Sequence, residues 1–242
     1  MIRIARRDPP KILPSRTRRR GLCGFRYNER LVVKTLWDMQ HEKCCYCEMK
    51  IPEQGHLKAV EHFRPKSKFM ALKNDWNNLL LACAQCNGKK SDKFPLELTR
   101  EPNEPKVLHT RYDGKKREVK RPLLVDPTRE DPEEFLDFVM DISDELFGQI
   151  MPRNGNIRGK ETIRVIGLCD EFYLNQHRMF MRDCLIPTYS QLTSARDTRN
   201  TDLENSCTRE FKKFMHETYR FAAVARAFAR HYKLDRYGIK IP

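Results

Sequence analysis

Four cysteines occur in two short pairs, and this spacing is typical of a metal site. The pairs are Cys44-x-x-Cys47 and Cys83-x-x-Cys86. Two such pairs on one chain can place four thiolates tetrahedrally around zinc. The chain has nine cysteines and no signal-peptide pattern, so metal ligation is favoured over disulfides. Two alternatives stay open: buried, inert cysteines, or a shifted site in which Cys45 replaces Cys44.

The residues between the two cysteine pairs could carry catalysis. Glu61 and His62 follow Val60 at the end of a short apolar run, which predicts a strand. Pro65 helps to end that strand, because it has no N–H for a sheet ladder. A carboxylate is a hard metal ligand, and a neutral histidine can accept a proton near neutral pH. Taken alone, a Glu-His pair is weak evidence, since on a surface strand it usually has no function.

Polar residues also flank the second cysteine pair. Asn78 precedes a short apolar run at 79–81, which predicts a buried strand, and the second cysteine pair then opens a polar helix. Asn87 directly follows Cys86, so a metal bound to the cysteines would fix its position. The sequence therefore predicts a rigidly supported polar residue at the start of this helix.

This order of residues resembles the ββα-metal fold of HNH nucleases. The order is Cys-x-x-Cys, acidic-His-x-x-Pro, Asn-Leu, Cys-x-x-Cys-Asn and then Lys. The fuller pattern, with Glu-His-Phe-Arg-Pro-Lys and Trp-Asn-Asn-Leu-Leu-Leu-Ala-Cys, resembles the PtuB-type HNH proteins of Septu and retron phage-defence systems. The resemblance is specific over residues 44–95 and loose in the C-terminal half. It implies an α+β fold, with a ββα-metal nuclease core, a four-cysteine zinc site and a mainly helical C-terminal region.

The resemblance also implies a role for each candidate residue. His62 would be the general base that activates water, and Asn78 would fasten the loop that orients it. Glu61 and Asn87 would hold one catalytic divalent cation, while Cys44, Cys47, Cys83 and Cys86 would bind structural zinc. The family more often has Asp in place of Glu61 and His in place of Asn87. The amide oxygen of Asn87 is a hard ligand, which favours Mg²⁺ or Mn²⁺.

Three lysines near these motifs could hold flanking phosphates, namely Lys66, Lys89 and Lys90. Solvated surface lysines are an equally good interpretation of these residues. Hydrolysis of a phosphodiester needs an activated nucleophile, and it needs charge neutralisation at the phosphate and at the leaving oxygen. A histidine base and one bound cation would meet both needs.

The composition favours a polyanionic partner. The chain has 47 Lys and Arg against 33 Asp and Glu, for a formal net charge of +14. Neutralised phosphates release counterions, so such an excess strengthens binding to nucleic acid, although it could simply keep the protein soluble. No stretch approaches the roughly 20 apolar residues of a membrane span. We therefore expect a cytoplasmic protein with no membrane partner.

We expect three parts in the chain. Residues 1–30 form a basic arm that includes Arg16 and Arg18 to Arg20, residues 31–120 form the HNH domain, and residues 121–242 form a small hairpin and helices. Residues 101–122 are expected to be an exposed connection. The expected elements outside the motifs are a helix at 29–41 capped by Asn28, strands at 123–125, 134–141 and 149–151 with Gly148 in a turn, and helices covering 163–174, 179–192 and 203–232.

Three functions compete. The first is a catalytic endonuclease acting on DNA, the second is the same enzyme acting on RNA such as tRNA, and the third is a non-catalytic zinc-ribbon adaptor. An adaptor needs neither a base nor a metal ligand, so the joint presence of Glu61, His62, Asn78 and Asn87 favours an enzyme. The chemistry acts on the phosphate and does not separate DNA from RNA.

We expect control of the nuclease to come from outside the chain. The sequence contains no Gly-x-x-x-x-Gly-Lys nucleotide-binding loop. The resemblance implies a separate ABC-like ATPase subunit, PtuA, which binds and gates the nuclease, and in retron systems a reverse transcriptase with its non-coding RNA. Phe211, Phe214, Phe221 and Phe228 are expected to be mainly core, with a partner-docking face as the alternative.

Overall fold

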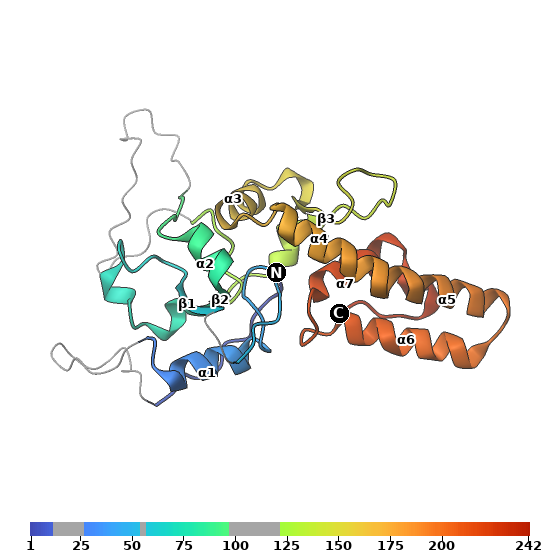
Figure 1. Cartoon of the computed structure of the whole chain (residues 1–242), viewed down its shortest axis with the longest axis horizontal. Helices are drawn as coiled ribbons and strands as arrows, with labels where there is room; N and C mark the ends of the chain where they lie inside the picture. Colours follow the sequence, from blue (N-terminus) through green and yellow to red (C-terminus); the bar gives the residue numbers. More distant parts are fainter. Residues whose placement is uncertain (12–26, 54–56, 97–121) are drawn as a thin grey trace.

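The two halves of the chain form the two ends of an elongated molecule that shares one hydrophobic core. The computed structural model describes residues 1–11, 27–53, 57–96 and 122–242. At one end lie α1 (Arg30–Met39), β1 (Lys58–His62), β2 (Leu79–Cys83) and α2 (Ala84–Lys90), as Figure 1 shows. The remaining elements are β3 (Leu136–Phe138), β4 (Ile150–Pro152), α3 (Ile157–Ile166), α4 (Glu171–Phe180), a π-helical turn (Met181–Leu185), α5 (Ile186–Asp197), α6 (Thr201–Met215), α7 (Ala222–His231) and 3₁₀ turns at Met70–Leu72, Trp76–Asn78, Pro132–Glu134, Arg153–Gly155 and Leu234–Tyr237.

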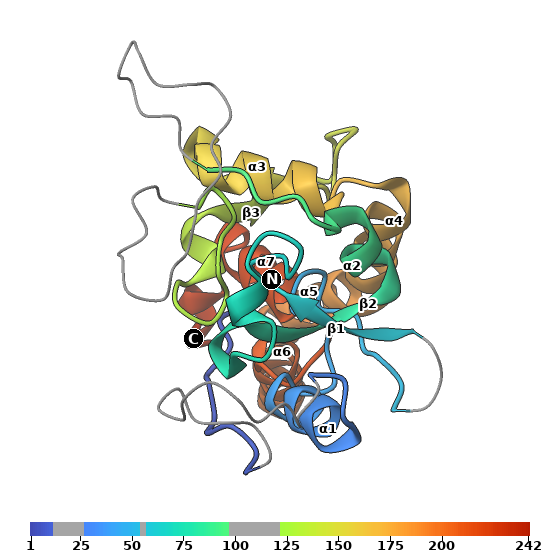
Figure 2. The same cartoon turned by 90° about the vertical axis from the view of Figure 1, so that its left-hand side faces the viewer.

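Strands β1 and β2 form a small sheet that carries the Glu-His pair and Cys83. They pair antiparallel in a register that runs from Lys58 opposite Cys83 to His62 opposite Leu79. Figure 2 shows the two strands between α1 and α2, and both helices contact the sheet. The strand that ends at His62, the buried strand at 79–81 and the polar helix after the second cysteine pair are thus confirmed, as is the α+β class.

Helix α1 packs through one apolar stripe, as its spacing predicted. Val32, Leu36 and Met39 are buried, and together they cover one face of the helix. The predicted cap is wrong, because the helix begins after Glu29 and no side chain caps its first turn.

The first residues of the expected arm are packed against the protein. Ile2 and Ile4 are buried, and the amide of Ile4 donates to the carbonyl of Pro127 at 2.7 Å. Arg6 donates from Nη1 to the carbonyl of Leu79 at 2.6 Å, which ties this segment to β2. The first residues of the expected basic arm are therefore part of the packed structure. The arginines at 16 and 18–20 and the connection up to residue 121 lie outside the described residues.

The second small sheet is shorter than the sequence predicts. Strands β3 and β4 pair antiparallel, and Gly148 lies between them with φ +84°. A side chain there would meet the Met181 side chain at 2.8 Å, so the turn needs glycine. The strand expected at 123–125 is absent, because the Val125 amide donates to the Thr162 hydroxyl at 3.0 Å instead of to a neighbouring strand.

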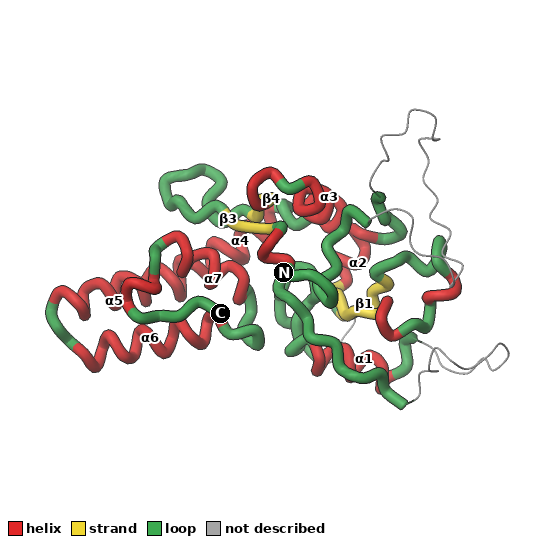
Figure 3. The backbone as a smooth tube through the Cα atoms, turned by 180° about the vertical axis from the view of Figure 1, so that it is seen from behind, coloured by secondary structure: helices red, strands yellow, loops and turns green. Residues whose placement is uncertain are grey.

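The C-terminal helices are more broken than predicted. The segment 163–174 is divided between α3 and α4 by Gly167, which has φ +72°. The helix expected at 203–232 is two helices, α6 and α7, and Phe221 before α7 has φ +54°. Figure 3 shows α5 and α6 as a pair that extends away from the rest of the molecule. The phenylalanines at 211, 214, 221 and 228 are all buried, so their predicted use as core is confirmed.

None of the helices in the described ranges has the length and the apolar character that crossing a membrane requires.

Candidate metal centre and catalytic site

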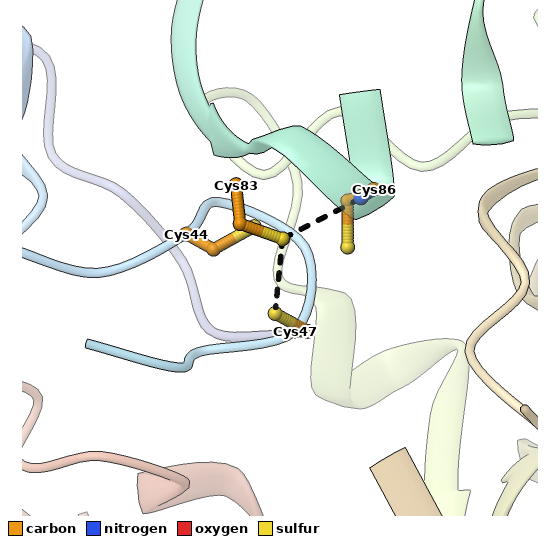
Figure 4. A group of neighbouring side chains, drawn as sticks. All are labelled: Cys44, Cys47, Cys83 and Cys86. Atoms are coloured by element: carbon orange, nitrogen blue, oxygen red, sulfur yellow. Dashed lines mark hydrogen bonds between the residues drawn. The ribbon is translucent and has the colours of Figure 1, made fainter. Parts of the chain in front are cut away.

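The two cysteine pairs meet in space. Cys44 and Cys47 lie in the loop between α1 and β1, Cys83 ends β2, and Cys86 lies in the first turn of α2 (Figure 4). The four Sγ atoms all lie within 4.8 Å of one another. Cys45 does not belong to this group, so the shifted arrangement is wrong. Among the described residues, this is the one group of three or more His, Cys, Asp or Glu side chains placed to hold a metal ion.

Backbone and side-chain donors favour negative charge on two of the four sulfur atoms, those of Cys44 and Cys83. The amide of Tyr46 points at Cys44 Sγ at 3.5 Å, and the amide of Cys86 points at Cys83 Sγ at 3.4 Å. Burial opposes ionisation of Cys44, but hydrogen bonds from the thiols around it hold its pKa well below the usual value. Four soft thiolates in a buried cluster form a donor set that suits a structural metal ion such as zinc.

Asn78 ties together a loop that ends beside the candidate base. Its Oδ1 accepts from the Arg64 amide at 2.8 Å, and its Nδ2 donates to the carbonyls of Arg64 at 2.9 Å and Leu72 at 3.3 Å. The next carbonyl along the chain, that of Lys73, lies 2.9 Å from His62 Nε2. The buried amide of Asn78 therefore fixes the loop whose end orients His62, while its part in a reaction stays a prediction.

His62 is held as a neutral ring with one nitrogen committed. A carbonyl oxygen can only accept, so Nε2 must carry the proton that it donates to Lys73, which leaves Nδ1 with a lone pair. Burial lowers the pKa of His62 to about 4, and the ammonium groups of Lys66 and Lys90 act in the same direction. The Tyr27 ring packs edge-on against the imidazole, with 4.6 Å between ring centroids. At neutral pH the ring can thus accept a proton at Nδ1.

Glu61 faces a buried lysine. Its Oε1 lies 2.5 Å from Lys90 Nζ and accepts from the Tyr46 hydroxyl at 3.2 Å. Lys90 also donates to the carbonyl of His62 at 2.9 Å. Burial raises the pKa of Glu61, and the ammonium of Lys90 opposes that shift. Lys90 is fully buried, so its predicted contact with flanking phosphates is wrong; it neutralises Glu61 instead.

The other predicted site residues lie at the surface around this centre. Asn87 is half-buried on α2, one turn before Lys90, and α2 contacts β1. Lys66 is exposed and donates to the Tyr27 hydroxyl at 2.6 Å. Lys89 is half-exposed and pairs with Asp170 at 2.8 Å. The structure thus brings Glu61, His62 and the helix of Asn87 together, with two lysines still accessible beside them.

Three tyrosines beside the site were missed from the sequence. Tyr46 bonds Glu61, Tyr27 packs on His62, and Tyr173 places its hydroxyl 3.1 Å from Cys86 Sγ. Tyr46 lies within the first cysteine pair, and that position could have drawn attention to it. Tyr173 is 87 residues from Cys86 and carries no such signal.

Sequence comparison with known proteins places a nuclease family over the same residues that form the site. A family model described as HNH endonuclease matches residues 44–93. The chain is 26% identical over 183 residues to the Septu protein PtuB of Bacillus thuringiensis, a match that covers 76% of this chain and 58% of that protein. It is 31% identical over 156 residues to the Septu protein PtuB of Bacillus mycoides (strain KBAB4), which covers 59% of this chain and 48% of that protein.

A third relative is the Septu protein PtuA of Bacillus mycoides (strain KBAB4), 30% identical over 108 residues, which are 40% of this chain and 14% of that protein. The chain spans about half the length of the PtuB relatives that it matches. No solved structure matches it. The HNH match coincides with the cysteine cluster, the Glu-His strand and the helix of Asn87, so residues 44–93 form an HNH domain, in a chain that is similar to PtuB proteins.

Proposed function

We propose that this protein is a metal-dependent endonuclease that hydrolyses phosphodiester bonds of nucleic acid, with DNA as the preferred substrate. The observation that carries the proposal is the state of His62. Its Nε2 is committed to the Lys73 carbonyl at 2.9 Å, and its Nδ1 is left as a neutral base. The match to the HNH family and the net charge of +14 support a polyanionic substrate.

In the proposed reaction, Nδ1 of His62 takes a proton from a water molecule as its oxygen attacks phosphorus. The bond between phosphorus and the leaving oxygen then breaks. The growing positive charge on the ring strengthens the hydrogen bond from Nε2 to Lys73, which was made before the reaction. A divalent cation held by Glu61 and Asn87 would neutralise charge at the phosphate and at the departing oxygen. The ammonium of Lys90 opposes the effect of burial and favours the ionised form of Glu61 for that role.

One carboxylate and one amide form a sparse ligand set. Such a set suits Mg²⁺ or Mn²⁺, which keep several water molecules when bound to protein. Zinc at the four cysteines would be structural, because Cys83 and Cys86 fix the start of α2 and thereby the place of Asn87. Lys66 and Lys89 remain the candidates for contacts with flanking phosphates.

The test is a cleavage assay on purified protein with duplex DNA, single-stranded DNA and tRNA, in the presence of Mg²⁺ or Mn²⁺. EDTA should stop cleavage, and added Mg²⁺ should restore it. His62→Ala should lower turnover about 10²- to 10⁴-fold while nucleic-acid binding persists. His216→Ala is the matched control, since His216 is exposed and its ring contacts Thr218. Binding without cleavage by the wild type would point to the adaptor, and preferential cleavage of tRNA would move the substrate to RNA.

We further propose that the nuclease serves anti-phage defence and is gated by a PtuA-type ATPase. Support comes from the relatives, two of which are named Septu protein PtuB and one Septu protein PtuA. A retron reverse transcriptase and its non-coding RNA remain a prediction from the resemblance alone. Co-expression with a PtuA-type ATPase should yield one complex on size-exclusion chromatography. A chain that stays separate and cuts freely without the ATPase would contradict gating and leave the nuclease proposal intact.

A further inference from the structure

Helix α2 is fastened from outside the HNH region by the α3–α4 junction, which we define as residues 167–173. The fully buried Tyr173 places its hydroxyl 3.1 Å from Cys86 Sγ and 4.0 Å from Cys83 Sγ. If Cys86 is a thiolate it can only accept, so the hydroxyl of Tyr173 is the donor. The first turn of α2 is therefore tied to α4 through a sulfur atom of the metal centre.

The second tie lies one turn further along α2. Lys89 Nζ pairs with Asp170 Oδ2 at 2.8 Å. Asp170 is the N-cap residue of α4, yet its side chain accepts no hydrogen bond from that helix. A carboxylate at this position ordinarily bonds the amides of the first turn. Here it is directed to Lys89 instead, so the contact with α2 takes the place of a local cap.

The backbone of the junction approaches α2 closely. Gly167 ends α3 with φ +72°, and a Cβ atom there would lie 3.3 Å from Lys89 Cδ and 3.4 Å from Asp170 Oδ1. That space is already occupied by the two partners of the ion pair. The left-handed turn and the missing side chain at Gly167 together allow the junction to sit against α2.

These contacts bracket Asn87. Cys86 and Lys89, the two residues of α2 that the junction holds, lie on either side of it in the sequence, and Lys90 on the inner side holds Glu61. Helix α2 has only seven residues, and a helix of that length has little stability of its own. Its orientation, and with it the place of the Asn87 amide, is set by what it contacts.

We propose that the α3–α4 junction positions the nuclease centre: Tyr173 and Asp170 hold α2 so that Asn87 faces the catalytic cation. This inference rests on the proposed function, because it assigns Asn87 the role of a ligand. Tyr173 and Asp170 are positioning residues, since they act through Cys86 and Lys89. The C-terminal helices are then part of the machinery of the site as well as of the core.

The test uses the full chain loaded with zinc, and three variants. Tyr173→Phe removes one hydroxyl and leaves the ring in the core, and Asp170→Asn removes the charge that faces Lys89. The control is Glu161→Gln, which breaks an exposed ion pair with Arg164 on α3 that does not involve α2. The readouts are the rate of zinc loss to a chelator, amide hydrogen exchange of residues 84–91, and the Mg²⁺ concentration that gives half-maximal cleavage.

Tyr173→Phe should lose zinc about tenfold faster than the wild type, as is usual when a partner of a metal ligand is removed. Asp170→Asn should raise exchange in α2 and should raise the half-saturating Mg²⁺ about two- to fivefold, the scale of one partly exposed ion pair. The control should match the wild type in all three readouts. Measurements of zinc loss and amide exchange need no substrate, so they test the role of the α3–α4 junction even if the wild type shows no cleavage.

The proposal would be overturned if Tyr173→Phe lost zinc at the wild-type rate and Asp170→Asn showed the same amide exchange in residues 84–91 as the wild type. A rise in exchange spread evenly over the chain would also overturn it, because that pattern indicates general destabilisation and not the release of α2. An effect confined to residues 84–91, with the control unchanged, is the result that supports it.

Discussion

Breaking the buried pair of Glu61 and Lys90 should cost more stability than removing it altogether. Glu61 is 2% exposed and Lys90 0% exposed, and their charged atoms lie 2.5 Å apart. Loss of one partner from such a pair leaves a buried, uncompensated charge, which costs about 3–5 kcal/mol. The free energy of unfolding of a domain is typically about 5–15 kcal/mol, so either single variant should lose a large part of the protein's stability.

The two single variants differ in how the remaining charge can be relieved. In Lys90→Met the Glu61 carboxylate loses its cation, and burial then raises its pKa further. A group whose pKa is raised by folding stabilises the protein at low pH and loses that contribution as the pH rises. Lys90→Met should therefore be least stable at neutral pH and recover towards about pH 4. In Glu61→Gln the buried ammonium loses its counter-charge and keeps neutral partners such as the His62 carbonyl.

The assay is urea unfolding of the wild type, both single variants and Glu61→Gln/Lys90→Met, with zinc present throughout. We expect the double variant to lose less stability than either single variant, so the coupling energy should exceed about 3 kcal/mol, because the double variant buries no unpaired charge. Glu210 and Lys213 provide an exposed control pair at 3.1 Å, and their cycle should give less than about 1 kcal/mol. Single variants that cost under about 1 kcal/mol, or a double variant whose cost equals the sum of the singles, would refute the reasoning.

Three further results are expected. His62→Ala should lower kcat about 10²- to 10⁴-fold. In the wild type, kcat/KM should fall on the acid side near pH 4, because burial lowers the pKa of His62 to about 4 and the base works only when neutral. A fall near pH 6.5 would contradict this. Cys83→Ser should lower both zinc content and melting temperature, and folded, active protein without zinc would exclude a structural metal. Burial also lowers the pKa of His177 to about 4, so between about pH 6.5 and pH 4 the unfolded chain binds a proton that the native state does not. The free energy of unfolding should therefore be highest above about pH 6.5 and fall by up to about 3 kcal/mol towards pH 4. In urea unfolding, His177→Gln should reduce that decline.

The sequence by itself determined the local chemistry of this protein. Two Cys-x-x-Cys spacings predicted the four-thiol cluster, because a knuckle is formed within a few residues and places its own ligands. The apolar runs before Glu61 and after Asn78 predicted the two strands, since burial of a short strand is visible in consecutive residues. These elements needed no knowledge of distant contacts, and the structure has them where they were expected.

Only the tertiary structure decided the rest. The sequence around a lysine near a nuclease motif suggests a surface charge, and whether the lysine is buried depends on which carboxylate packs over it. Lys90 pairs with Glu61, which lies on a strand 29 positions earlier in the sequence. The breaks at Gly167 and Phe221 were hidden because helical spacing continued across them, while packing required the chain to turn. Tyr173 reaches Cys86 across 87 residues. Such contacts follow from how the whole chain closes on one core, and no local pattern carries that information.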